Sequence, residues 1–147
     1  MNSKNKIDMK RYLLNILGLF FPILLWAQGG QYDVVVVGGT PGGIMTAIAA
    51  SREGKTAVIL ERSGHIGGLP ANGLGATDIS TRGATTGLFT EFVGHILDYY
   101  VEKYGKDSEQ VKMCSDGYHF EPHVAAWVFD QMLAPEKERV TVLTMRQ

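Results

Sequence analysis

A strand, a glycine-rich turn, a helix and a second strand follow one another within residues 32–60, and this order restricts the fold more than any other feature. The apolar run Asp33–Val37 shows no alternation with polar residues, which is typical of a central strand buried on both faces of a parallel sheet. A helix is expected over residues 44–53, ended by Gly54, and a second strand over residues 56–60. This spacing matches the roughly 30 residues of a βαβ unit. The sequence therefore predicts an α/β fold with a parallel sheet and flanking helices.

The turn between the first strand and the helix has the composition of a phosphate-binding loop. Dinucleotide-binding proteins place glycines at its first, third and sixth positions, because a pyrophosphate must reach the free N–H groups of the helix N-terminus. Gly38 and Gly43 hold the first and sixth positions, and Thr40 replaces the middle glycine. With a β-carbon at this position, either the phosphate sits slightly differently or the threonine hydroxyl takes part in binding.

An acidic residue, Glu61, follows the second strand, eighteen residues beyond Gly43. A carboxylate at this place can accept hydrogen bonds from both ribose hydroxyls of an adenosine, and it would repel the 2′-phosphate of NADP. The alternative is that Glu61 is only a polar residue that ends a strand. Together with the strand, the turn and the helix, its position predicts dinucleotide binding.

Segments beyond the βαβ unit resemble a known family of flavoenzymes. The stretch Leu60–Leu69, with an acidic residue followed closely by a Gly-Gly pair, resembles the FAD-dependent oxidoreductases of the glutathione-reductase-like superfamily. The segments Gly73–Asp78 and Phe120–Ala125 resemble its branch named simply FAD-dependent oxidoreductase, whose bacterial members are often secreted and sometimes carry a xanthan-lyase name. The resemblance extends from Tyr32 to about Met145. It implies a Rossmann-like FAD/NAD(P)-binding domain and FAD as the cofactor.

The same resemblance implies which residues bind FAD, and it leaves the catalytic residues unknown because the flavin itself carries the chemistry. Glu61 would bind the adenosine ribose and Arg62 would lie beside the adenine or ribose. The remaining residues are the glycine turn, which would cradle the pyrophosphate, and a second group close to the ribityl and flavin portion: Gly38, Gly39, Thr40, Pro41, Gly42 and Gly43, then Gly67, Gly68 and Leu69.

The rest of the chain is expected to form two more helices and a third strand. An amphipathic helix is predicted over residues 88–104, a helix starting at Pro122, and a strand over residues 140–144. Residues 70–87 are predicted as a small, glycine-rich loop, and residues 106–116 as a polar connector that holds the single cysteine. Asp78 and Arg82 in the loop are interpreted as solvated residues rather than substrate contacts.

Other features of the sequence argue against a metal site, a redox-active disulfide and a nucleic-acid partner. The triplet His119, Glu121 and His123 suggests metal ligands, but a helix starting at Pro122 leaves His119 off their shared face, so no metal site is predicted. Cys114 has no second cysteine, which excludes a redox-active disulfide within this chain. The balance of 14 Lys and Arg against 15 Asp and Glu disfavours nucleic acid as a partner. The expected substrate is an unidentified small or sugar-related molecule.

The N-terminus resembles a secretory signal, with basic residues up to Arg11 followed by an uncharged, largely apolar segment up to Ala27. We expect residues 1–27 to be a signal peptide, the mature chain to begin near Gln28, and the protein to be secreted or periplasmic. The alternative is an uncleaved membrane anchor, although about sixteen apolar residues fall short of the ~20 that a helix needs to span a bilayer.

Residues 32–147 are expected to be the N-terminal part of a longer FAD-binding domain, because three parallel strands would leave an open sheet edge. The favoured function is therefore the portion of an FAD-dependent oxidoreductase that holds the pyrophosphate and adenosine ribose. Two alternatives are a non-catalytic dinucleotide-binding module that needs a partner chain, and a portion of an NAD-dependent enzyme.

Overall fold

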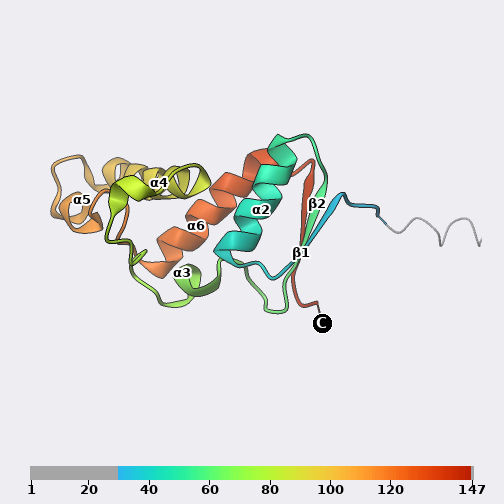
Figure 1. Ribbon diagram of the computed structural model, residues 1–147. Helices are drawn as coiled ribbons and strands as arrows, with labels where there is room; N and C mark the ends of the chain where they lie inside the picture. Colours follow the sequence, from blue (N-terminus) through green and yellow to red (C-terminus); the bar gives the residue numbers. More distant parts are fainter. Residues whose placement is uncertain (1–29, 147) are drawn as a thin grey trace, which may run out of the picture. The chain divides into compact units, whose positions relative to one another are not determined.

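The computed structural model describes residues 30–146 of the 147-residue chain, so the signal peptide predicted for residues 1–27 lies outside the described residues. No helix within residues 30–146 is long and apolar enough to cross a membrane. The elements follow in the order β1 (Val34–Val37), α2 (Pro41–Arg52), β2 (Ala57–Leu60), α3 (Gly68–Asn72), α4 (Leu88–Tyr104), α5 (Glu109–Cys114), α6 (Pro122–Leu133) and β3 (Val140–Leu143), with short 3-10 turns at Arg82–Ala84 and Ala134–Glu136 (Figure 1).

The three strands form a parallel sheet in the order β1-β2-β3, with Val36 beside Ile59 and Ile59 beside Val142. This confirms the predicted α/β class. The prediction that the first strand is central and buried on both faces is wrong for the described residues, because β2 is the central strand. Val35 and Val37 of β1 are 58% and 86% exposed. An unbroken apolar run identifies a strand, but it does not identify the elements that cover it.

The helices gather on one face of this sheet. Figure 1 shows α2 against the strands and α6 beside α2, with α4 and α5 beyond α6. The core between helices and sheet is apolar: Ile44 and Ile48 of α2 and Ile59 of β2 are fully buried. Phe92 of α4 stacks on Phe129 of α6, with 4.7 Å between the ring centroids. The chain between β2 and β3 therefore adds a helical layer that extends the core beyond the sheet.

Two segments predicted as irregular contain helices. α3 ends at Asn72, inside the predicted loop, and α5 occupies residues 109–114 of the predicted connector. Ser108 caps α5, since its hydroxyl accepts a hydrogen bond from the N–H of Val111. Cys114 closes this helix and is 3% exposed, so it does not lie in a polar loop as predicted. Both helices are too short to produce a clear hydrophobic period.

Candidate functional site

The glycine turn between β1 and α2 brings the strand and the helix unusually close together. Gly38 has a φ of +100°, a conformation that favours glycine. A β-carbon on Gly43 would lie 2.2 Å from the carbonyl oxygen of Gly38 and 2.9 Å from Cγ1 of Val36. Only glycine at position 43 therefore allows α2 to begin directly against the end of β1.

Two backbone N–H groups of this turn lack a protein acceptor within residues 30–146. The N–H of Gly43 donates to the Thr40 hydroxyl at 3.3 Å, and the N–H of Ile44 donates to the Thr40 carbonyl oxygen. The N–H of Gly39 donates to Glu61, whereas those of Thr40 and Gly42 donate to none of the described residues. They lie at the positive end of a twelve-residue helix. An anion would find both hydrogen-bond donors and a favourable potential here.

Glu61 ties the end of β2 to the glycine turn. Its Oε2 accepts a hydrogen bond from the N–H of Gly39 at 2.7 Å, and its Oε1 accepts one from the N–H of Ser63 at 2.6 Å. The hydrogen bonds from Ser63 and then Gly39 lower the pKa of Glu61 to about 2, so the carboxylate is ionised at neutral pH. Each carboxylate oxygen has a further lone pair, and therefore both can still accept hydrogen bonds from a ligand.

The second glycine pair lies against the first. The N–H of Gly67 donates to the carbonyl oxygen of Gly39 at 2.6 Å, and a β-carbon on Gly67 would lie 2.5 Å from Cβ of Ala71. A β-carbon on Gly68 would lie 3.0 Å from Cδ of Pro41. The structure thus brings residues from both predicted groups, about 25 positions apart, into direct contact through the buried backbone of Gly39 and Gly67.

Two predicted site residues present their side chains to solvent instead. Arg62 is exposed, and Leu69 at the start of α3 is 72% exposed. Neither side chain takes part in the hydrogen bonds that join the glycine turn, Glu61 and the second glycine pair. The roles of Arg62 and Leu69 in cofactor binding therefore stay predictions.

A cavity of about 310 Å³ lies beside the first turn of α2, and we call it the aromatic cavity. One polar atom in its lining stands out: the hydroxyl oxygen of Thr77 is buried and has no hydrogen-bond partner among residues 30–146. Sequence reasoning missed Thr77, because a threonine in a glycine-rich loop carries no signal of burial. The lining consists of Pro41, Gly42, Met45, Pro70, Leu74, Ala76, Thr77, Phe89, Phe92, Phe120 and Phe129.

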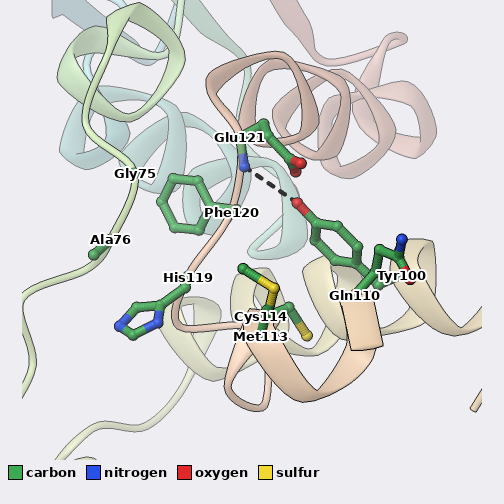
Figure 2. A pocket seen from close by; sticks show the side chains of 9 residues that line it. All are labelled: Gly75, Ala76, Tyr100, Gln110, Met113, Cys114, His119, Phe120 and Glu121. Carbon is green, nitrogen blue, oxygen red and sulfur yellow. Dashed lines mark hydrogen bonds between the residues drawn. The ribbon is translucent and has the colours of Figure 1, made fainter. Parts of the chain in front are cut away.

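A second cavity, the Cys114 pocket of about 460 Å³, lies between α4, α5 and two short segments of chain (Figure 2). The segments contain Ala76 and His119, which pair as an antiparallel bridge. The hydroxyl of Tyr100 accepts a hydrogen bond from the N–H of Glu121 at 3.2 Å, and the thiol of Cys114 donates to the carbonyl oxygen of Val111 at 3.1 Å. The Tyr100 hydroxyl and the Cys114 thiol are therefore already engaged in hydrogen bonds within the fold.

Arg82 is solvent-exposed, as predicted from sequence, but its guanidinium also binds other parts of the protein. Its guanidinium donates to Asp116 at 2.8 Å and to Ser115 at 2.5 Å, and it lies over the ring of Tyr118 at 4.4 Å. Asp78 is exposed. Among residues 30–146, no group of three or more His, Cys, Asp or Glu side chains is arranged to hold a metal ion.

Comparison with known families decides which dinucleotide this arrangement serves. Residues 33–147 match the sequence model of the family described as FAD dependent oxidoreductase. The chain belongs to this family. Its cofactor is FAD, and the parallel sheet with flanking helices is the corresponding Rossmann-like fold.

Individual relatives share shorter stretches. A soluble pyridine nucleotide transhydrogenase of Mycobacterium tuberculosis is 45% identical over 42 residues, which are 29% of this chain and 9% of that protein. A 3-oxosteroid 1-dehydrogenase of Mycolicibacterium smegmatis is 38% identical over 48 residues, 33% of this chain and 8% of that protein. The chain thus spans about a tenth of the length of these curated relatives.

Similar solved structures include THI4 of Thermovibrio ammonificans, with a TM-score of 0.44 and 16% identity over 97% of this chain and 48% of that one. The L-amino acid deaminase from Proteus vulgaris has a TM-score of 0.45 and 19% identity over 79% of this chain and 40% of that one.

The residues of the site fit FAD on structural grounds. The N–H groups of Thr40 and Gly42, which have no acceptor among residues 30–146, suit a pyrophosphate. Glycine at positions 39, 43 and 67 allows the close backbone packing that forms this turn, since a β-carbon at each would lie within 3 Å of other protein atoms. The orphaned hydroxyl of Thr77 lies in a cavity that shares Pro41 and Gly42 with the glycine turn. Phosphate donors and an adjacent apolar cavity are what a cofactor with a charged centre and an aromatic end requires.

Proposed function

We propose that this chain contributes the FAD-binding segment of an oxidoreductase, and that the glycine turn Gly38–Gly43 holds the FAD pyrophosphate. The observation that carries the proposal is the pair of free N–H groups, from Thr40 and Gly42, at the N-terminus of α2. Because Gly39, Gly42 and Gly43 carry no β-carbon, only the side chains of Thr40 and Pro41 border the approach of a diphosphate to this backbone.

The two halves of the cofactor extend to opposite sides of this turn in our proposal. Glu61 accepts hydrogen bonds from the adenosine ribose with the lone pairs that Gly39 and Ser63 leave free, and Arg62 lies beside the adenine or ribose. The backbone of Gly67, Gly68 and Leu69 passes close to the ribityl and flavin portion. When bound, FAD supplies the transfer of hydride or electrons, and the protein supplies position and electrostatics.

A charge substitution at the helix cap tests this proposal without removing the cap. Thr40→Asp and Thr40→Asn both place a good N-cap residue at the start of α2, so both variants should fold as well as the native chain. Only Asp adds a negative charge beside the pyrophosphate. At an effective dielectric of about 20–80, this repulsion is worth roughly 1–4 kcal/mol, which is about fivefold or more in affinity.

The measurement is a fluorescence titration of the full chain with FAD, repeated with ADP. We expect Thr40→Asp to weaken the binding of both ligands at least about fivefold relative to Thr40→Asn, with the difference shrinking as salt rises. Equal affinities of the Asp and Asn variants for both ligands would show that the pyrophosphate binds elsewhere.

We further propose that the protein is exported to the periplasm or the exterior by the segment 1–27. The support is the sequence of basic residues followed by an apolar run that ends at Ala27. The placement within the glutathione-reductase-like superfamily and its secreted bacterial branch likewise rests on the sequence resemblance.

A further inference from the structure

The hydroxyl of Thr77 is a buried polar group that has no partner among the described residues. Buried hydroxyls are nearly always hydrogen-bonded, because a donor or acceptor removed from water and left unpaired costs free energy. The backbone of the same residue is satisfied, since its N–H donates to the carbonyl oxygen of Tyr118 at 3.0 Å. Thr77 is therefore held in place by its main chain while its side chain lacks a hydrogen bond.

The surroundings of this hydroxyl suit a flat, largely apolar ligand. Four phenylalanines line the aromatic cavity together with Thr77, and two of them, Phe92 and Phe129, are already stacked on each other. The volume of about 310 Å³ lies at the lower end of the ~300–1,000 Å³ range of small-molecule sites. The cavity can therefore accept a portion of a large cofactor, and Thr77 offers that portion a single polar contact.

The position of the cavity indicates which portion this is. Pro41 and Gly42 line it, and the same two residues belong to the turn proposed to hold the pyrophosphate. Glu61, proposed to hold the adenosine ribose, is absent from its lining. The cavity thus adjoins the proposed pyrophosphate site, and Pro70, which directly follows the group Gly67–Leu69 proposed to lie near the flavin, also lines it.

We propose that Thr77 is a specificity-determining contact for FAD, whose hydroxyl hydrogen-bonds the flavin half of the cofactor inside the aromatic cavity. This inference rests on the proposed function, because it takes the pyrophosphate to lie at the glycine turn. It assigns a ligand group to the one buried polar atom that the protein leaves unpaired within residues 30–146. It also explains how the chain would distinguish FAD from ADP, which shares the pyrophosphate and adenosine but has no flavin.

Thr77→Val tests the proposal, because valine keeps the shape of threonine and removes only the hydroxyl. Titrations of the full chain with FAD and with ADP separate the contribution of the flavin half from that of the pyrophosphate and adenosine, because ADP lacks the flavin. We expect Thr77→Val to weaken FAD about 3- to 10-fold, the effect of one lost hydrogen bond, and to leave ADP unchanged. Thr77→Ser, which keeps the hydroxyl, should recover most of the lost FAD affinity. The matched control is Thr86→Val, the same change at an exposed position.

Thermal unfolding without ligand supplies a readout that is independent of binding. A hydroxyl that stabilises the protein itself would lower the unfolding temperature when removed. We expect no decrease for Thr77→Val, since the hydroxyl has no protein partner to lose.

Several outcomes would overturn the inference. Unchanged FAD affinity in Thr77→Val would mean that water satisfies the hydroxyl, and equal losses for FAD and ADP would mean a general change of the site. A lower unfolding temperature without ligand would assign Thr77 a structural role. If the native chain binds ADP as tightly as FAD, the flavin half is not held in the cavity although the glycine turn functions. If the native chain binds neither, the proposed function fails and this inference fails with it.

Discussion

The contact between α2 and β1 gives the sharpest prediction for the fold of the site. In Gly43→Ala the new β-carbon would lie 2.2 Å from the carbonyl oxygen of Gly38, where ordinary contacts begin at 3.4 Å. The obstacle is backbone and cannot rotate away, so the turn must move by about 1 Å in a closely packed region. Overpacking of this kind costs about 1–3 kcal/mol, and a backbone obstacle places the cost near the upper end.

A neighbouring glycine provides the matched control. A β-carbon on Gly42, one residue earlier in the same helical turn, would have nothing within 4 Å. Both variants gain about 0.5–1 kcal/mol because alanine loses less backbone entropy than glycine on entering a helix. We therefore expect Gly43→Ala to be destabilised by about 2 kcal/mol and Gly42→Ala to be stabilised slightly, a difference of roughly 3 kcal/mol between adjacent positions.

Urea unfolding followed by circular dichroism measures both free energies in the absence of ligand. The thermal midpoint should fall by roughly 8 °C in Gly43→Ala, at about 4 °C per kcal/mol for a domain of this size. An ordinary surface substitution changes the free energy of unfolding by up to about 0.5 kcal/mol. If the unfolding free energies of the two variants agree within this amount, α2 does not begin as close to β1 as the structure describes, and the reasoning is refuted.

Two further predictions concern the acidic residue and the N-terminus. The folded chain holds the pKa of Glu61 near 2, below its ordinary value of 4.5, so ionised Glu61 stabilises the fold fully above about pH 4.5 and this contribution disappears as the pH falls through 2. The unfolding free energy of the native chain should therefore fall more steeply between pH 4.5 and 2 than that of Glu61→Gln, and parallel curves would contradict the hydrogen bonds to Gly39 and Ser63. N-terminal sequencing of the protein from its native cell should find a start near Gln28, whereas an intact Met1 in the membrane fraction would favour the anchor.

Much of the local architecture can be predicted from the sequence. The helix expected over residues 44–53 begins three residues earlier in the structure, since Thr40 caps it and Pro41 occupies its first position. The two apolar strands, the helix of residues 88–104 and the helix that starts at Pro122 are all confirmed. These features depend on hydrophobic period, glycine and proline within a few residues of one another, and such signals are present in the sequence itself.

The contacts of the site require the tertiary structure. The spacing of Glu61 suggests a ribose ligand, but only the fold shows its carboxylate fastened to Gly39, 22 residues earlier in the chain. Arg82 is solvent-exposed, as the sequence predicts, but only the fold shows that its guanidinium pairs with Ser115 and Asp116, more than 30 residues away. A charged residue in a loop gives no local indication of a partner so distant.

The sequence by itself determined the βαβ unit, the glycine turn and the family resemblance, because turn chemistry and periodicity act along the chain. Tertiary structure alone decided that β1 lies at an edge of the described sheet, that the two glycine pairs meet, and that the hydroxyl of Thr77 is buried without a partner. Burial and hydrogen bonding depend on which distant segments pack together, and that packing is a property of the folded chain.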